Sequence, residues 1–449
     1  MKLKLQKLWM NNRFKPLSLI RQGYFIFNNF IELYDMNKFK GYSKITIVLN
    51  ELEKKVLVVE EYIIVNGQIY TESQKIEQGY IHIKDGKILE IGSNYNIERL
   101  NELKGIYPTI DAKGHHVIPG FIDIHIHGGY GEDAMDASQE GLKHLAEQLL
   151  SEGTTSFLAT TMTQSGESIK QALQNISNYH QIQDVQQAAE IVGIHLEGPF
   201  ISEHKVGAQH PKYVQRPTAD KINQFQQTAN QLIKIITFAP EVEGAIDTLK
   251  SLNNDIIFSM GHTVATFEEA NNAVDYGAKH ITHLYNAATG FGHRDPGVFG
   301  AAWLNQNLNT EIIVDGIHSH PAAVALAYKN KGNEHLYLIT DAMRAKGMPE
   351  GEYDLGGQNV IVRNSEARID TGALAGSILK MNDGLRNIMS YTGASIKDLW
   401  RVTSWNQAKA LGIDRTKGSI KEGKDADIVI VDDNINVKTT IKNGQPHTF

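Results

Sequence analysis

Two histidines separated by a single residue, His125 and His127, end a short apolar segment of the chain. Because side chains alternate between the two faces of a strand, both imidazoles are expected on one face, where they can bind one cation. The chain has 18 histidines and no cysteine. Histidine and carboxylate are therefore the strong metal ligands available to it, and a thiolate site or a disulfide framework is excluded.

Acidic residues and histidines also follow other apolar runs of the chain, and they include Glu197, His262, His283, His318 and Asp341. A lone histidine is usually a surface or packed residue, but the repetition at the ends of successive runs indicates one shared site. Histidine and carboxylate suit Zn²⁺, Fe²⁺, Mn²⁺ or Co²⁺, and geometry selects among these metals more than affinity does. Asp341 is the candidate general base, which would accept a proton from water and return it to a leaving nitrogen.

Eight short apolar runs recur through the middle of the chain, at residues 117–122, 155–159, 191–194, 233–238, 256–260, 280–282, 312–314 and 336–339. Longer segments with helical periodicity, such as residues 141–150 and 267–274, lie between them. This alternation predicts an α/β fold, a (β/α)8 TIM barrel over roughly residues 115–412. In such a barrel the carboxyl ends of the strands meet at one rim, so the polar residues that follow the runs are expected to lie together.

Short β-rich runs with hairpin-type turns flank this region on both sides. Asn66-Gly67 and Asp85-Gly86 lie before it, and Asn443-Gly444 lies after it. Such dipeptides favour tight turns between antiparallel strands. Because neither fragment can bury a sheet face alone, we predict that residues 57–114 and 413–449 form one small, discontinuous β-sandwich domain.

Residues 1–56 have a different character, with basic residues that precede an aromatic run at residues 24–27. The segment lacks the apolar core and the small-residue cleavage site of a signal peptide. We interpret it as a disordered N-terminal extension, translated from upstream of a natural start at Met36. The alternative is a basic amphipathic stretch that touches a membrane surface.

Charge and hydropathy argue against two broad classes of protein. Lys and Arg total 44 against 51 Asp and Glu, a formal net charge of −7, which argues against a basic nucleic-acid-binding protein. No apolar run reaches the roughly 18 to 20 residues that a membrane span needs. We expect neither a nucleic acid nor a membrane among the partners of this protein.

Residues 119–128 (PGFIDIHIHG), with His262, His283 and Asp341 downstream, resemble the metal-dependent amidohydrolase superfamily, including its flanking sandwich. Five further motifs resemble the N-acetylglucosamine-6-phosphate deacetylase family, in order along the chain: residues 195–200, 261–263, 282–287, 293–297 and 374–377. The glutamate of His-Leu-Glu-Gly-Pro-Phe is the most specific signal, because many relatives have a carbamylated lysine there. The resemblance runs from about residue 60 to the end, and the segment before residue 56 has no counterpart.

The resemblance implies a set of metal ligands. Glu197, His262 and His283 match the ligands of the tighter site in the family, and Asp341 matches its catalytic aspartate. His125 and His127 match the ligands of a second metal in those members that keep both histidines. One or two divalent cations per subunit are therefore expected.

The resemblance also implies substrate contacts. His210 matches a loop histidine that contacts the acetyl group, and Asn286 and the backbone of Ala287 match phosphate contacts. Arg294 and His318 match cationic residues that bind the sugar phosphate, in the family partly from a neighbouring subunit, which implies a homodimer. A guanidinium suits a phosphate dianion; the alternative for Arg294 is an ion pair with Asp295.

The function implied is hydrolysis of the acetamide of N-acetyl-D-glucosamine 6-phosphate to D-glucosamine 6-phosphate and acetate, in cytoplasmic amino-sugar catabolism and cell-wall sugar recycling. One alternative is the galactosamine isomer, since the sequence does not reveal which epimer binds. Another is a cyclic amidohydrolase or deaminase, against which Glu197, Arg294 and His318 argue. A metal-free binding protein is a third, although such a protein would be expected to have lost ligands and none is missing here.

Overall fold

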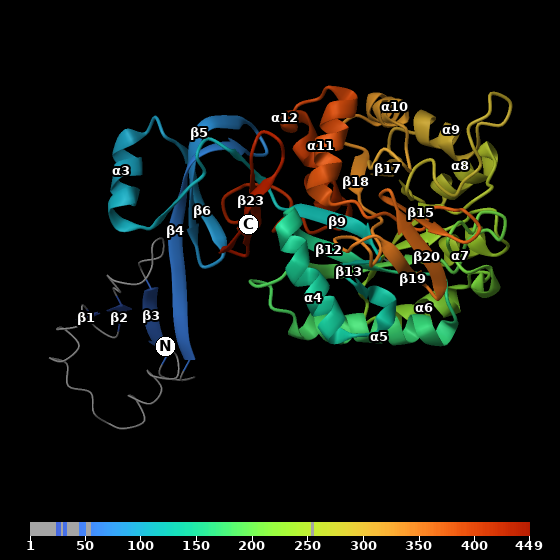
Figure 1. Cartoon of the computed structure of the whole chain (residues 1–449), viewed down its shortest axis with the longest axis horizontal. Helices are drawn as coiled ribbons and strands as arrows, with labels where there is room; N and C mark the ends of the chain where they lie inside the picture. The colour runs from blue at the N-terminus through green and yellow to red at the C-terminus, as the bar shows by residue number, and fades with distance from the viewer. Residues whose placement is uncertain (1–23, 28–29, 34–44, 51–54, 253–255) are drawn as a thin grey trace.

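The computed structural model describes residues 24–27, 30–33, 45–50, 55–252 and 256–449. They form a small β-rich part beside a larger part in which strands and helices alternate (Figure 1). Among these residues no helix is both long and apolar enough to cross a membrane.

The larger part is built on an 8-stranded parallel sheet whose strands follow one another in chain order. They are β9 (Phe121–Ile126), β12 (Thr154–Thr161), β13 (Glu190–Glu197), β14 (Ile233–Phe238), β15 (Ile257–Met260), β16 (His280–Ile281), β17 (Asn309–Ile313) and β18 (Leu336–Ile339). The last strand returns to the first, where the backbone N–H of Asp341 donates to the carbonyl of His125 at 2.8 Å. This closure confirms the expected (β/α)8 barrel.

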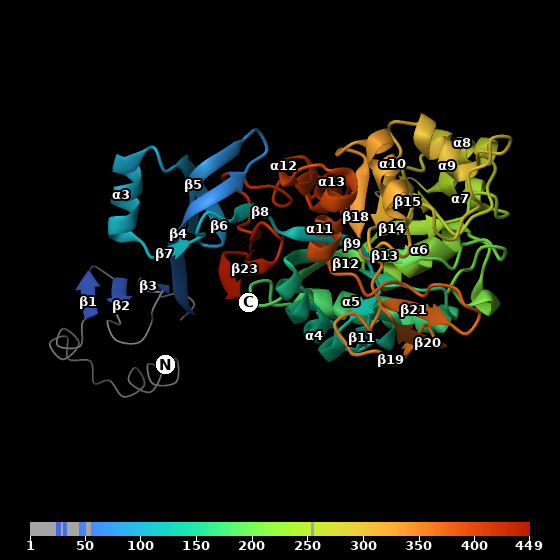
Figure 2. The same cartoon turned by 45° about the horizontal axis from the view of Figure 1, so that its top comes forward.

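Helices lie outside the barrel strands (Figure 2) and bury their apolar faces against them. They are α4 (Gln139–Leu149), α5 (Gly166–Ile182), α6 (Ala219–Thr228), α7 (Ala245–Ser251), α8 (Phe267–Asp275), α9 (Gly297–Leu304), α10 (Pro321–Lys331), α11 (Met381–Thr392), α12 (Ile396–Leu399) and α13 (Trp405–Ala410). In α4, Ser138 accepts a hydrogen bond from Gly141 N and so caps the first turn, while Leu142, Leu145 and Leu149 are buried at helical spacing.

The small part combines strands from both flanks of the barrel. Its elements are β4 (Lys55–Tyr70), β5 (Lys75–Lys84), β6 (Lys87–Ser93), α3 (Ile97–Ile106), β7 (Thr109–Asp111), β8 (His116–Pro119), β22 (Ile428–Val431), β23 (Val437–Lys442) and β24 (Gln445–Thr448). Strand β8 lies between β4 and β22. The two fragments thus share one sheet, as expected for a small discontinuous β part.

Two of the three expected turns are confirmed. Asp85-Gly86 joins β5 to β6 and Asn443-Gly444 joins β23 to β24, with positive φ at all four residues. The expectation for Asn66-Gly67 is wrong, because this dipeptide lies inside β4, where the register with β5 shifts. Positive φ at Asn66 therefore serves a bulge rather than a chain reversal.

The first expected barrel strand, residues 117–122, is in fact two strands. The chain passes from the small sheet (β8) to the barrel (β9) at Gly120. A Cβ at this glycine would lie 2.3 Å from Cγ2 of Thr155, so no larger residue fits between the two sheets. The apolar run is continuous because both sheets bury it.

Part of residues 1–56 is described as strands β1 (Tyr24–Phe27), β2 (Phe30–Leu33) and β3 (Ile45–Asn50), which pair in order up to β4. The rest of this range, apart from the start of β4, lies outside the described residues. Disorder of the extension and its contact with a membrane surface stay predictions.

The rim of the barrel carries additional short strands. They are β10 (Gly128–Gly129) with β11 (Glu132–Asp133), and the antiparallel sheet of β19 (Gly351–Leu355), β20 (Gln358–Arg363) and β21 (Glu366–Ile369). The turn between β19 and β20 contacts the segment before His210, because Gln358 Nε2 donates to the carbonyl of Ala208. This small sheet thus covers a loop beside the site described below.

A buried ion network joins the two parts of the molecule. Lys442 Nζ, on a fully buried side chain, lies 2.9 Å from Asp427 Oδ2 and 3.2 Å from Glu190 Oε2. Lys417 Nζ contacts the same two oxygens at 2.9 and 2.7 Å. Because Glu190 begins β13 and Asp427 precedes β22, the network holds the C-terminal strands against the barrel.

We expect Asp427→Asn to lower the free energy of unfolding by about 3–5 kcal/mol, since both lysines lose a charged partner in a buried site. Burial raises the pKa of Asp427, but Lys442 and Lys417 outweigh it and lower the pKa from 3.8 to about 2. The carboxylate therefore stabilises the fold above about pH 4, and this contribution is lost as the pH falls from about 4 towards 2. Denaturant unfolding of both proteins across this range measures the difference.

Asp433→Asn provides the matched control, because this carboxylate is 88% exposed beside His116. Its effect is expected within about 0.5 kcal/mol. Equal losses in the two variants would contradict the structural role assigned to the network.

Candidate metal centre

Six of the residues singled out by sequence lie together at the carboxyl rim of the barrel. His125 lies in β9 and His127 follows it, Glu197 ends β13, His262 and His283 follow β15 and β16, and Asp341 follows β18. All six are buried. The parallel strands bring residues more than two hundred positions apart to one point, as the barrel topology requires.

Glu197 is the centre of this cluster. Its Oε1 lies 3.0 Å from His283 Nε2, 3.2 Å from His262 Nε2 and 3.3 Å from His125 Nε2. Its Oε2 lies 3.2 Å from His127 Nε2 and accepts a hydrogen bond from Gln209 Nε2 at 2.5 Å. The two oxygens of one carboxylate thus face two adjoining groups of imidazoles.

Asp341 completes the second of these groups. Its Oδ1 lies 3.3 Å from His127 Nε2 and 3.5 Å from His125 Nε2. Glu197, His262 and His283 form one set of ligand atoms within 4.8 Å of one another, and His125, His127 and Asp341 form another. Nitrogen and carboxylate ligands that converge in a buried site fit a divalent transition metal, so the residues present suit one or two such cations.

Opposite charges control protonation in the cluster. Burial lowers the pKa of His125, but Asp341 and Glu197 outweigh burial and raise this pKa well above its usual value. For His127 burial is outweighed in the same way, by hydrogen bonds to Asp341 and Glu197, and its pKa rises to about 10. Burial raises the pKa of Asp341, yet His125 and His127 lower it overall to about 2. A cation bound to these residues must displace the protons held on the imidazoles.

The backbone of the site is strained at three of its residues. His262, His283 and Asp341 have φ values of 48°, 29° and 49°, in a region that costs non-glycine residues about 1–3 kcal/mol. Hydrogen bonds oppose relaxation, since Asp341 O accepts from Ser377 N at 2.7 Å and His262 O accepts from Ser202 N at 2.9 Å. The rim therefore holds these side chains in orientations that a relaxed strand end would not give.

In the described part of the chain, the contacts of His210 are with residues outside the cluster. Its Nδ1 accepts a hydrogen bond from Lys212 N at 3.3 Å, and its ring lies 4.9 Å from that of Tyr213. The preceding residue, Gln209, is buried and reaches Glu197 instead, while its Oε1 accepts from Thr163 N at 2.6 Å. The acetyl-group contact assigned to His210 stays a prediction.

The other expected substrate residues lie on the loops that follow β16 and β17. Asn286 is half-buried and donates to Leu284 O at 3.2 Å, and Ala287 has a φ of 47°. His318 Nδ1 lies 2.6 Å from Asp315 Oδ2. Arg294 is exposed, and no ion pair joins it to Asp295 among the described residues.

Two residues of the site were missed by the sequence analysis, Glu311 and Gln209. Glu311 lies in β17 and its Oε2 is 3.0 Å from His125 Nδ1. The signal available in the sequence was a charged residue directly before the apolar run at residues 312–314. Gln209 lies in a loop without periodicity, and no comparable signal marks it.

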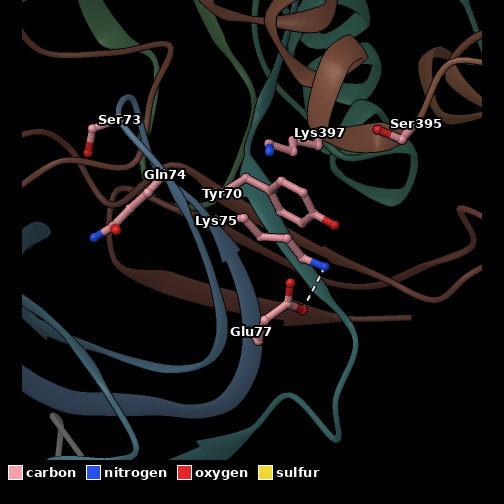
Figure 3. Close-up of a pocket in the computed structure, with 7 residues that line it drawn as sticks. All are labelled: Tyr70, Ser73, Gln74, Lys75, Glu77, Ser395 and Lys397. Carbon is pink, nitrogen blue, oxygen red and sulfur yellow. Dashed lines mark ion pairs between the residues drawn. The ribbon is translucent and has the colours of Figure 1, made fainter.

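A separate cavity of about 500 Å³ lies between the β4–β5 turn and the start of α12 (Figure 3). Tyr70, Ser73, Gln74, Lys75, Glu77, Ser395 and Lys397 line it. None of the residues of the metal centre lines this cavity. Lys75 already pairs with Glu77 at 2.7 Å, so the lining has no charge arrangement comparable to that of the rim.

Comparisons with known proteins agree with this geometry. The Amidohydrolase family matches residues 116–446. N-acetylglucosamine-6-phosphate deacetylase of Bacillus subtilis is 46% identical over 391 residues, which cover 86% of this chain and 97% of that protein. N-acetylgalactosamine-6-phosphate deacetylase of Escherichia coli O157:H7 is 35% identical, over 74% of this chain and 87% of its own.

A solved structure extends the comparison to the fold. A variant of N-acetyl-D-glucosamine-6-phosphate deacetylase from Mycobacterium smegmatis, in complex with N-acetyl-D-glucosamine-6-phosphate, has a TM-score of 0.78 and 26% identity. The match covers 86% of this chain and 99% of that one. Sequence and fold therefore agree over the same part of the molecule.

Proposed function

The chain belongs to the amidohydrolase family, and on that premise we propose that it hydrolyses the acetamide of N-acetyl-D-glucosamine 6-phosphate to D-glucosamine 6-phosphate and acetate. The observation that carries the proposal is the rim cluster centred on Glu197, together with the 46% identity to the Bacillus subtilis deacetylase. A cluster of imidazoles and carboxylates at the carboxyl rim is where a barrel of this kind places its chemistry.

Glu197, His262 and His283 would hold the tighter of two cations, and His125 with His127 would hold the second. Zn²⁺, Fe²⁺, Mn²⁺ and Co²⁺ all suit this donor set. A divalent cation bound there supplies a Lewis acid that polarises the amide carbonyl and makes water acidic enough to react near neutral pH. The protein residues supply the remaining steps.

Asp341 would carry the proton between water and the leaving group. Its Oδ1 lies beside the ligand imidazoles, 3.3 Å from His127 Nε2, so the carboxylate is placed to accept a proton as water oxygen bonds to the acetyl carbon. It would then give this proton to the amide nitrogen while the carbon–nitrogen bond breaks. The products are the free amine of the sugar and acetic acid, which keeps the second proton of the water and ionises to acetate at neutral pH, and Asp341 returns to its starting state.

Arg294, His318, Asn286 and the backbone of Ala287 would bind the 6-phosphate, and His210 would contact the acetyl group. The exposed guanidinium of Arg294 suits a phosphate dianion by charge and by its paired donors. Asp315 holds His318 by a hydrogen bond of 2.6 Å, which fixes the orientation of its ring. Phosphate recognition would then select the phosphorylated sugar over the free one.

The experiment that tests this function is acetate release from N-acetylated sugars, with and without a 6-phosphate, by protein supplied with a divalent metal. We expect Arg294→Ala to raise KM for the phosphorylated sugar far more than for the unphosphorylated one. Arg415→Ala, which removes an exposed guanidinium outside the rim loops, is the matched control. Equal KM changes for both sugars would contradict the phosphate assignment.

N-acetyl-D-galactosamine 6-phosphate is the second candidate substrate, because the Escherichia coli O157:H7 relative is named for it. The same acetate assay distinguishes the epimers by kcat/KM. The homodimer and the cytoplasmic location stay predictions from the resemblance.

A further inference from the structure

Glu311 is a buried carboxylate in the wall of the barrel, next to the metal centre but with no assigned role. Its side chain is fully buried, and β17, which carries it, lies between β16 and β18. Burial of a carboxylate is costly unless partners compensate it. Within the described residues Glu311 Oε1 has no hydrogen-bond partner, so the compensation comes through the other oxygen of the carboxyl group.

The other oxygen of Glu311 contacts two ligand residues. Oε2 lies 3.0 Å from His125 Nδ1 and accepts a hydrogen bond from the backbone N–H of His283 at 3.3 Å. The backbone carbonyl of Glu311 accepts from Leu284 N at 2.8 Å. A single residue therefore contacts one imidazole ring and the backbone that carries a second.

Glu311 is the contact of His125 at Nδ1, whereas Glu197 and Asp341 lie at its Nε2, where the cation would bind. Asp123 Oδ1 accepts from the backbone N–H of His125 at 3.2 Å, and the ring of His195 packs edge-on at 4.4 Å. Neither contact determines which nitrogen of His125 carries a proton. The carboxylate at Nδ1 does, because an acceptor there requires Nδ1–H and leaves the lone pair on Nε2.

We propose that Glu311 is a positioning residue of the metal centre: it holds the Nδ1–H of His125 and so fixes Nε2 as a ligand for the cation that His125 shares with His127. The inference rests on the proposed function in one respect, that these two histidines bind a cation. The geometry agrees, since His125 Nε2 faces Glu197 and Asp341 at 3.3 and 3.5 Å. Carboxylate partners of ligand histidines raise metal affinity about 10- to 100-fold.

The experiment titrates the metal-free protein with Zn²⁺ in competition with a chromophoric chelator. Wild-type protein is expected to bind two cations, the weaker at His125 and His127. Glu311→Met, which removes the acceptor at similar volume, is expected to weaken the second cation about 10- to 100-fold and to leave the tighter one unchanged. Glu311→Gln keeps an oxygen acceptor and is expected to lose less than Glu311→Met.

Two further variants show the result expected when a ligand is lost and the result expected when only packing changes. His127→Ala removes a ligand and is expected to lose the weaker cation altogether, while Ile312→Val, on the same strand, changes packing alone and is expected to retain both. Should Glu311→Met fail to fold, Glu311→Asp withdraws the carboxylate by one methylene and takes its place with the same expectation.

In the Zn²⁺-loaded protein, a hydrogen-bonded Nδ1–H signal of His125 in the NMR spectrum is expected for wild type and Glu311→Gln and not for Glu311→Met.

Three outcomes would overturn the positioning role: equal weakening of both cations in Glu311→Met, equal affinities in the Met and Gln variants, or wild-type protein that binds a single cation. No sugar enters the measurement. A failure of acetate release would therefore contradict the proposed function and leave this result unaffected.

Discussion

Replacing Asp341 by asparagine is expected to lower kcat about 10²- to 10⁴-fold, because the amide has the shape of the carboxylate but accepts no proton from water. KM for the phosphorylated sugar is expected to change little, since Asp341 lies among the ligand imidazoles and not on the loops assigned to the phosphate. Steady-state kinetics of acetate release measures both constants.

Metal analysis of Asp341→Asn separates this role from that of a ligand. The cation held by Glu197, His262 and His283 is expected to remain after dialysis, because Asp341 lies outside that set. Asp370→Asn, an exposed carboxylate after β21, controls for the loss of charge. Loss of substrate binding with kcat unchanged would reassign Asp341.

Removal of the tighter cation is expected to abolish turnover. His283→Ala deletes a nitrogen that lies 3.0 Å from Glu197 Oε1 and leaves two ligands in a set of three, so this site is expected to empty on dialysis. Chelation of the wild-type protein is expected to have the same effect, and added Zn²⁺, Fe²⁺, Mn²⁺ or Co²⁺ is expected to restore activity to the wild type alone. Metal content and acetate release are measured on the same samples.

His144→Ala, an exposed histidine of α4, controls for a change in histidine content and is expected to behave as wild type. Full activity in rigorously metal-free protein would contradict the mechanism. The pair of variants also discriminates between roles, since Asp341→Asn should keep the tighter cation and His283→Ala should lose it.

The architecture and the candidate ligand residues could be predicted from the sequence, because the barrel strands recur along the chain and the candidate residues follow them. Alternating apolar and helical segments indicate the barrel, and parallel strands carry whatever follows them to one rim. His125, His127, Glu197, His262, His283 and Asp341 follow or end such runs, and the structure brings all six together. The motifs around them supplied the family.

Features that leave no periodic pattern in the sequence were decided by the tertiary structure. The division of residues 117–122 at Gly120 depends on how closely the chain passes Thr155, and Asn66-Gly67 is a bulge because β5 pairs along both sides of it. A dipeptide prefers a backbone conformation, but the strand opposite determines whether that conformation reverses the chain.

Contacts between segments far apart in the sequence also determine the surroundings of the metal centre. The loop that carries Gln209 and His210 shows no periodicity in its sequence, and its packing against Thr163 and Glu197 places Gln209 inward. Glu311 directly precedes the apolar run at residues 312–314, yet it contacts His125 from 186 positions away. The sequence by itself determined which residues end the barrel strands, since order along the chain becomes order around the barrel. Which side chains hold those residues in place was decided only by the folded chain, because such contacts depend on distances between segments that the sequence does not relate.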